Sequence, residues 1–540
     1  MMRSFEENES RAMLYVYSFI NGADWADEVQ QLDRMSKITK QDVVDWANKY
    51  LGPESYAIVY KREGKDPNEQ KIAAPKITPI VTNRDSQSEF LTEIQNSKVE
   101  PIEPVFVDYK KDMSQFEAQK GVNVLYKKNE TNDIFTLIYV FNTGTENDPA
   151  LNLAFDYLSY LGTDKMSAEQ IASEMYAIAC SFGLSAGTNQ SWIEVSGLSE
   201  NMGKAMEIVE GLIAGAQPNE EILQNLKGDM IKSRADAKLN QSRCFGALQR
   251  YMIYGSDFIR RTTLTDPALQ GLTSEQLLAK IGDLMGKQHE VLYYGPQDEA
   301  EVKAALAAHH KVAADLQPLE KKFSTLQPTD ENKVMLAQYD AKQLYYMQYS
   351  NRGEKFDLAA DPQITLYNEY FGGGMNTIVF QEMREARGLA YSAWANLAIP
   401  TNAKGDYYYM AFIATQNDKM QKAIEAFDEI INNMPESEKA FSIAKEALIS
   451  RLRTERTVKD GVLWSYIRMR DLGLTEPRGK QIFEKAQQMT LADVKAAQEK
   501  WVKGRKYVYG ILGDIQDLDL NYLKTLGPIQ TVTQEEIFGY

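Results

Sequence analysis

The chain repeats one pattern of residues at three places, and this duplication restricts its fold more than any other feature. The segments that begin at Thr39, Thr273 and Thr490 share a capping threonine, an acidic residue two or three positions later, an amphipathic helical pattern, and a run rich in Val, Ile and Tyr. The first two threonines lie 234 residues apart and the last two lie 217 apart. We therefore expect one fold to occur in several copies.

A second pair of helical segments gives the same period. Met202 matches Met420 and Ala205 matches Ala423, each with a shift of 218 residues. Two independent pairs that agree on one period indicate a duplicated unit. We expect four segments: the tail of a preceding unit (1–64), a Pro-rich and charged linker (65–100), a first full unit (101–322) and a second full unit (323–540).

Within a full unit, the hydrophobic patterns alternate between strand and helix periods. In the first full unit they predict paired strands, two helices and a further strand, at residues 122–129, 134–144, 151–162, 167–183 and 191–199. The predicted fold class is α+β, with tandem units of antiparallel sheet covered by helices on one face. The tail at residues 1–64 is predicted to supply a closing helix and strand.

Composition excludes several classes of function. With 60 basic and 76 acidic residues, the net charge of −16 disfavours nucleic acids and anionic membranes as partners. Cys180 and Cys244 are too few for a disulfide framework and are expected to be buried thiols. No apolar run reaches the length of a membrane span, and the first twenty residues lack the pattern of a signal peptide, so we expect a soluble chain. The compartment and an upstream targeting segment stay open.

The sequence at residues 183–187 reads G-x-S-x-G, the spelling of a nucleophile elbow. Such an elbow requires a strand before the serine and a helix after it. Here we expect a helix that ends at Phe182 and a strand that follows. Gly183 is therefore predicted to cap the helix.

The three histidines of the chain do not form a metal-binding pattern. His289 opens a strand-like segment, and Tyr293 stands where an H-E-x-x-H helix requires its second histidine. His309 and His310 are adjacent and have no partner one helical turn away. We expect these two to be solvated at the surface.

A glycine-rich stretch is the most informative segment. Gly372, Gly373 and Gly374 permit positive φ and close approach of the backbone, and helical spacing of apolar residues follows. Arg384 and Tyr391 come seven residues apart just beyond them.

The segment GGGMNTIVFQEMREARGLAYS resembles the C-terminal half of the pitrilysin/insulinase family of zinc metallopeptidases, where a glycine-rich turn, a helix, and an Arg seven residues before a Tyr recur. The closing helix and strand and the repeat period are similar as well. The resemblance implies four α+β units that close around a peptide chamber, with zinc on one of them. It also implies that Arg384, Tyr391 and the three glycines contact substrate.

The family's zinc motif is an inverted H-x-x-E-H that precedes a G-T segment. Gly162-Thr163 fits the G-T, which places Leu153, Asp156 and Tyr157 at the motif positions. Because no histidine stands there, we expect no catalytic residue and no zinc in this chain. The resemblance then implies that zinc lies on a unit upstream of Met1, in the N-terminal half of the same protein.

Two alternatives to this assignment remain. The chain could be an inactive partner of a separate active subunit, or a noncatalytic structural subunit of the same fold. The presence of both Arg384 and Tyr391 favours the peptidase assignment, with a peptide as substrate.

Overall fold

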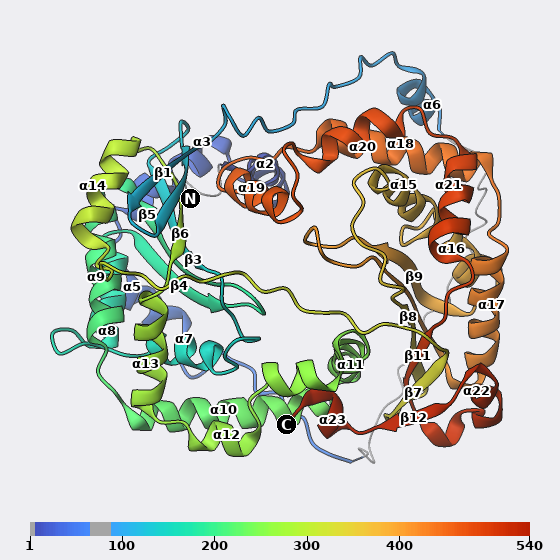
Figure 1. The fold of residues 1–540 in the computed structure, drawn as a ribbon. Helices are drawn as coiled ribbons and strands as arrows, with labels where there is room; N and C mark the ends of the chain where they lie inside the picture. Colours follow the sequence, from blue (N-terminus) through green and yellow to red (C-terminus); the bar gives the residue numbers. More distant parts are fainter. Residues whose placement is uncertain (1–5, 65–87) are drawn as a thin grey trace. The chain divides into compact units, whose positions relative to one another are not determined.

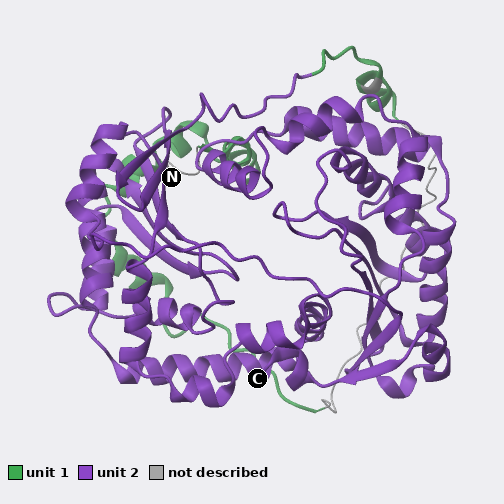
Figure 2. Cartoon of the chain, viewed as in Figure 1, with its two compact units in different colours: residues 1–101 green, residues 102–540 purple. Residues whose placement is uncertain are grey.

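The computed structural model describes residues 6–64 and 88–540. The chain divides into two compact units, residues 1–101 and residues 102–540 (Figure 2). Within the described residues, no helix combines the length and apolar character that a membrane crossing requires.

Unit 1 is helical in its described part. Its helices are α2 (Asn8–Asn21), α3 (Trp25–Val29), α4 (Gln31–Met35), α5 (Lys40–Tyr50) and α6 (Glu89–Asn96). As predicted, Thr39 caps α5 through a reciprocal capping box with Asp42. The predicted closing strand is wrong, because residues 56–60 adopt no strand and Val59 is 90% exposed. Of the predicted linker, residues 65–87 lie outside the described residues, and α6 occupies much of the rest.

Unit 2 contains two six-stranded sheets, which define a first repeat (residues 114–309) and a second repeat (residues 333–538) (Figure 1). The first sheet has the order β1-β2-β6-β3-β5-β4. Its strands are β1 (Ser114–Gln119), β2 (Val122–Lys128), β3 (Ile134–Phe141), β4 (Cys180–Ala186), β5 (Ser191–Leu198) and β6 (His289–Gly295). The helices of this repeat are α7 (Leu151–Ser159), α8 (Ala168–Ala177), α9 (Met202–Gly215), α10 (Glu220–Lys238), α11 (Gln241–Thr262), α12 (Asp266–Gly271), α13 (Ser274–Met285) and α14 (Glu299–His309).

The second sheet has the order β12-β7-β11-β8-β10-β9. Its strands are β7 (Lys333–Gln338), β8 (Gln343–Ser350), β9 (Ala390–Ala398), β10 (Tyr408–Gln416), β11 (Val508–Gly513) and β12 (Ile529–Val532). The helices are α15 (Asp361–Phe371), α16 (Ile378–Phe380), the π-helix η2 (Gln381–Ala386), α17 (Met420–Asn432), α18 (Glu438–Thr454), α19 (Gly461–Asp471), α20 (Arg478–Ala486), α21 (Leu491–Ala497), the π-helix η4 (Gln498–Val502), α22 (Leu520–Leu526) and α23 (Gln534–Phe538). Short 3₁₀ turns precede α9 and α17 and follow β11.

The two sheets share one order, strand by strand, except at one edge. β2, β6, β3, β5 and β4 correspond to β7, β11, β8, β10 and β9, whereas β1 and β12 come from opposite ends of their repeats. Thr273 and Thr490 cap the equivalent helices α13 and α21 through capping boxes, as the repeat predicts. The α+β class is therefore confirmed. The predicted purely antiparallel pairing is wrong, because β2 pairs parallel with β6 and β7 pairs parallel with β11, so both sheets are mixed.

The predicted direct pairing of β2 with β3 is wrong. β6 lies between them and pairs with both strands. Residues 122–141 resemble a hairpin in sequence, but the largely buried strand β6, from the far end of the repeat, lies between the two strands. β6 and β11 thus lie in the interior of their sheets, although each comes last in sequence among the five strands that the two sheets share.

Each sheet is covered on one face by helices of its own repeat. A helix from the other repeat covers part of the opposite face. α11 packs on the second sheet through Phe245, Leu248 and Met252. α19 packs on the first sheet through Val462, Leu463 and Ile467 (Figure 1). This exchange joins the repeats through two apolar contacts, which are favourable roughly in proportion to the area they bury.

Candidate substrate-contact site

The junction between a helix and the edge strand of the second sheet (the second-repeat junction, residues 372–392) contains all the site residues predicted for this repeat. α15 ends at Phe371, the glycines follow, and the chain passes through α16 and η2 into β9. A Cβ on Gly372 would lie 2.4 Å from the Asn368 carbonyl oxygen and 2.8 Å from that of Ala395. None of the three glycines has positive φ, so Gly372 is required for close approach, while Gly373 and Gly374 have room for a methyl group.

Local hydrogen bonds fold the glycine turn onto the helix. The Thr377 hydroxyl donates to the Gly374 carbonyl at 2.7 Å, and Gln381 Nε2 donates to the Met375 carbonyl at 2.6 Å. Ile378, Val379 and Met383 are buried in the hydrophobic core of the second repeat. The apolar face therefore holds the segment down, as the helical spacing predicts.

The helix ends in a π-helical turn rather than a regular α-helical one. η2 covers Gln381–Ala386, and Gly388 then turns the chain with φ of +57°. Wide turns of this type are rare and occur frequently at functional sites. The predicted course of the chain, from a helix through Gly388 into a strand at Tyr391, is what the structure contains.

Arg384 and Tyr391 lie against each other. The guanidinium carbon is 4.5 Å from the centroid of the Tyr391 ring and 4.9 Å from that of Phe380. Arg384 Nη1 also lies 3.5 Å from the Tyr391 carbonyl oxygen. Tyr391 is 80% exposed, whereas Arg384 is half-buried and its Nε lies 3.5 Å from Glu385 Oε1, so this cation–π pair presents mainly the phenol to solvent.

A β-bulge sets the orientation of Tyr391. On β10, Ala414 pairs with Ser392 and the next residue, Thr415, pairs with Ala390. Tyr391 is therefore the extra residue, with no partner of its own in the ladder. A bulge bends the strand locally and redirects a side chain, and such bulges concentrate at strand edges and near sites.

Ion pairs fasten this junction to the neighbouring helix α17. Arg387 lies 2.8 Å from Glu429 and 3.3 Å from Glu382. The hydrogen bond and charge of Arg387 lower the pKa of the Glu429 carboxyl. Lys419 donates to the Gly388 carbonyl at 3.2 Å. The segment that carries Arg384 is thus held to α17 just after Arg384, at Arg387 and Gly388.

The first repeat lies differently at its motif positions. Leu153 and Tyr157 are buried on α7, and only Asp156 is exposed. The Tyr157 hydroxyl oxygen accepts from the Asn219 N–H at 2.7 Å and lies 2.8 Å from Ser274 Oγ. A leucine offers no ligand atom and this phenol is engaged, so these residues do not fit zinc. Among residues 6–64 and 88–540, no group of three or more His, Cys, Asp and Glu side chains is placed to hold a metal ion.

The prediction of solvated histidines is wrong for His310. It is buried, with its Nε2 2.8 Å from His289 Nε2 and its Nδ1 2.6 Å from Glu210 Oε1. His289 Nδ1 lies 2.8 Å from the Lys287 carbonyl oxygen. The alanine-rich sequence around His310 did not indicate these contacts, because the partners of His310 come from β6 and α9, which are distant in sequence.

The predicted helix cap at Gly183 is also wrong. α8 ends at Ala177, Ala179 turns the chain with φ of +51°, and Gly183 lies inside β4. The G-x-S-x-G spelling falls on a strand and forms no nucleophile elbow.

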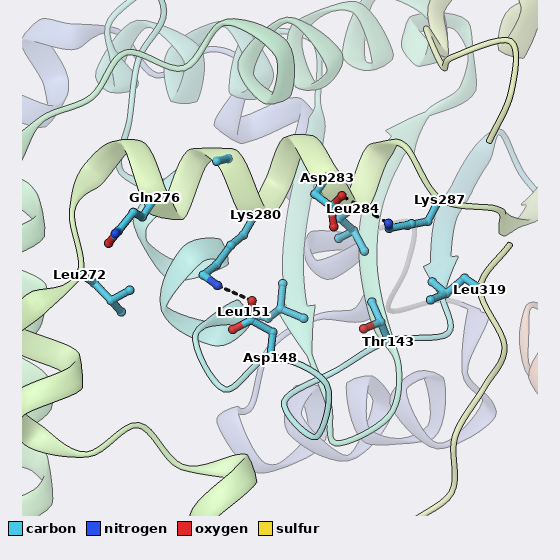
Figure 3. A pocket seen from close by; sticks show the side chains of 11 residues that line it. Thr143, Asp148, Leu151, Leu272, Gln276, Lys280, Asp283, Leu284, Lys287 and Leu319 are labelled. Carbon is cyan, nitrogen blue, oxygen red and sulfur yellow. Dashed lines mark hydrogen bonds and ion pairs between the residues drawn. The ribbon is translucent and has the colours of Figure 1, made fainter. Parts of the chain in front are cut away.

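A cavity of about 530 Å³ opens beside α13 in the first repeat (Figure 3). Its charged side chains are engaged with each other, since Lys280 pairs with Asp148 and Lys287 lies 3.3 Å from Asp283. Gln276 belongs to the capping box of α13. These side chains stabilise the helix and its contact with the loop before α7, and they leave no free charge for a ligand.

Comparison with known proteins agrees with this geometry. The family model described as the peptidase M16 inactive domain matches residues 286–448. A zinc protease of Streptomyces coelicolor is 23% identical over 269 residues, which cover 46% of this chain and 56% of that protein. A zinc protease of Rickettsia bellii is 24% identical over 310 residues, 56% of this chain and 70% of that protein.

Solved structures show the same fold. The peptidase M16 inactive domain of Pseudomonas fluorescens aligns with a TM-score of 0.60 at 18% identity, over 74% of this chain and 98% of that one. The periplasmic protease PqqL of Escherichia coli aligns with a TM-score of 0.61 at 14% identity, over 90% of this chain and 52% of that one. The fold is thus that of M16 peptidases. These matches support a relation to the pitrilysin/insulinase family of zinc metallopeptidases, in its C-terminal portion.

Proposed function

We propose that this chain is the part of a zinc metallopeptidase that contacts the substrate and carries no zinc. Zinc would lie on another unit, either the upstream N-terminal half of the same protein or a separate active subunit. Together the parts would hydrolyse peptides in an enclosed chamber, and this chain would supply wall and substrate contacts. The curated relatives are named zinc proteases. The match to PqqL covers 52% of that protein, which supports a second half of similar size beside the part that this chain represents.

The observation that carries the proposal is the Arg384–Tyr391 pair, in which the half-buried Arg384 on η2 packs on the exposed Tyr391 of the bulge. Both side chains donate hydrogen bonds, and a peptide carbonyl accepts them. In a site from which water is excluded, such donors stabilise the oxyanion that develops on the carbonyl. The glycine turn beside them leaves backbone accessible to an extended peptide, because Gly373 and Gly374 bear no side chains.

The alternative is a noncatalytic partner or structural subunit of the same fold. A structural role would need the pair only for packing. An 80% exposed Tyr391 contributes little packing within the chain, and this favours the substrate-contact role.

The test measures zinc and peptide cleavage together. We expect the purified chain alone to bind no stoichiometric zinc and to leave a fluorogenic peptide uncut, and we expect cleavage once the zinc-bearing unit is present. Removal of zinc from that assembly by a chelator should abolish cleavage. One tightly bound zinc per chain, lost together with peptidase activity on chelation, would contradict the proposal.

A further inference from the structure

A second cavity, of about 880 Å³, lies between the two repeats of unit 2. Its walls come from equivalent hairpin loops of the two sheets, the β4–β5 loop with Thr188 and the β9–β10 loop with Lys404. α11 and the connection around Phe323 complete it. The cavity is within the size range of ligand pockets.

Arg250 on α11 is oriented in this cavity before any ligand arrives. Its Nη2 donates to Thr262 Oγ1 at 2.9 Å, and its guanidinium carbon lies 5.6 Å from the centroid of the Phe258 ring. The Thr262 hydroxyl in turn donates to the Phe258 carbonyl at 2.9 Å, which fixes its lone pairs toward Arg250. Within the described part of the chain the guanidinium makes no other hydrogen bond, so its remaining N–H groups can serve an acceptor.

A break in α11 makes this geometry possible. Gly255 has φ of +82° and ψ of 170°, a conformation reserved for glycine. Gln327 occupies the gap, since its backbone N–H donates to the Ile253 carbonyl at 2.7 Å and its side chain donates to the Tyr254 carbonyl at 3.0 Å. The bend returns Thr262 to Arg250, twelve positions earlier on the helix.

Two of the basic side chains around the cavity have no acidic partner among the described residues. Each nearby carboxylate already has a basic partner, in the pairs Glu146–Arg261, Asp406–Lys355 and Asp471–Lys321. Glu146 also accepts from Ser324. Among the described residues, Arg250 and Lys404 form no ion pair with a carboxylate. In a chain of net charge −16, two unpaired cations at one cavity are a local exception.

The other walls suit an organic anion rather than a bare ion. Tyr254 and Phe258 stack with ring centroids 4.5 Å apart, and Tyr408 also lines the cavity. Burial raises the pKa of Tyr254 and of Tyr408, so both phenols keep their protons and stay hydrogen-bond donors. Aromatic faces beside a guanidinium fork match an apolar side chain that carries a carboxylate.

We propose that this cavity binds the free C-terminal carboxylate of a short peptide, with Arg250 as the principal partner and Lys404 as the second. The peptide character of the ligand rests on the proposed function. The cavity would thereby retain one end of a peptide or of a cleavage product.

The test is binding of acetyl-Ala-Ala-Ala-Phe to the full chain by calorimetry, as the free acid and as the C-terminal amide. We expect the acid to bind at least about tenfold more tightly, the factor that corresponds to 1.4 kcal/mol. Arg250→Gln should remove that preference, and Lys404→Gln on its exposed loop should reduce it about threefold. Arg243→Gln, on the same helix but outside the cavity, is the matched control and should leave it intact.

Equal binding of acid and amide, or an unchanged preference in Arg250→Gln, would overturn the proposal. Inorganic phosphate that displaces the peptide at equal concentration would overturn the assignment to a peptide. If thermal unfolding shows that Arg250→Gln does not fold, Lys404→Gln decides. The assay needs no peptidase activity, so its outcome is separate from that of the cleavage experiment.

Discussion

The same junction is built in two ways in the two repeats. In the first repeat (the first-repeat junction, residues 162–182), a regular helix α8 leads through Ala179 into β4, which pairs with β5 without interruption. In the second repeat, a glycine turn and the π-helix η2 lead through Gly388 into β9, which bulges at Tyr391. Both edge strands occupy the same place in the sheet order.

The two junctions show which features the fold requires for placing an edge strand and which it does not. A regular junction is sufficient to place an edge strand, as the first repeat demonstrates. The π-helical turn and the bulge are therefore additions in the second repeat, and both act on Arg384 or Tyr391. Irregular local structure that brings no evident gain in stability is expected at functional sites.

The largest effect on stability should come from the feature that the two junctions share, a glycine with no room for a side chain. Gly372, like Gly162 in the first repeat, has no room for a Cβ, which would lie 2.5 Å from the Met166 carbonyl oxygen in the latter case. We expect Gly372→Ala to lower the free energy of unfolding by about 3 kcal/mol, because backbone must move. Gly373→Ala is the matched control and should cost less than about 1 kcal/mol. Chemical denaturation measures both, and equal losses would refute the close-approach argument.

The buried histidines distinguish the repeats by pH, since Val508 occupies the place of His289 in the second sheet. Burial, and then the neighbouring His310, lower the pKa of His289 to about 4. The unfolded chain binds this proton near pH 6.5, so the free energy of unfolding should fall as the pH drops from about 6.5 to about 4, by roughly 2 kcal/mol at pH 5.

His289→Gln isolates this contribution from that of the carboxylates. Denaturation across the pH series should show a shallower loss below pH 6.5 in the variant than in the parent chain. Parallel curves for the two proteins would show that His289 binds its proton equally well in the folded and the unfolded chain, which would contradict the lowered pKa.

The turning residues of the junctions allow a reciprocal test. Ala179 and Gly388 both have positive φ, which costs an alanine about 1 kcal/mol and a glycine little. Gly388→Ala should therefore destabilise the chain by about 1 kcal/mol, and Ala179→Gly should leave it equally stable or slightly more so. Thermal unfolding of both variants checks this, and a stabilised Gly388→Ala would contradict the assigned turn.

Local elements of this fold were predictable from the sequence, and long-range ones were not. The capping boxes at Thr39, Thr273 and Thr490 form from residues three apart, so the pattern alone indicates them. Strands need partners: the run at residues 56–60 resembles β6, but β6 pairs with β2 and β3, and no described residue of unit 1 forms a strand for that run.

The candidate site divides in the same way. The spacing of Arg384 and Tyr391 was visible in the sequence, together with the helix and the turn at Gly388. The bulge that exposes Tyr391 depends on pairing with β10, and the contact of His310 with His289 depends on the packing of α9 and β6. No pattern within a short window carries such information.

The most direct test of the substrate-contact role is turnover by the zinc-bearing protein with Tyr391→Phe. Tyr176→Phe is the matched control, since Tyr176 is 87% exposed at the first-repeat junction. We predict that Tyr391→Phe lowers kcat by roughly 10² to 10³ with an unchanged melting temperature, because one hydrogen-bond donor to the transition state is lost. Tyr176→Phe should change neither quantity. An unchanged kcat in Tyr391→Phe, or a loss matched by a lower melting temperature, would contradict the account.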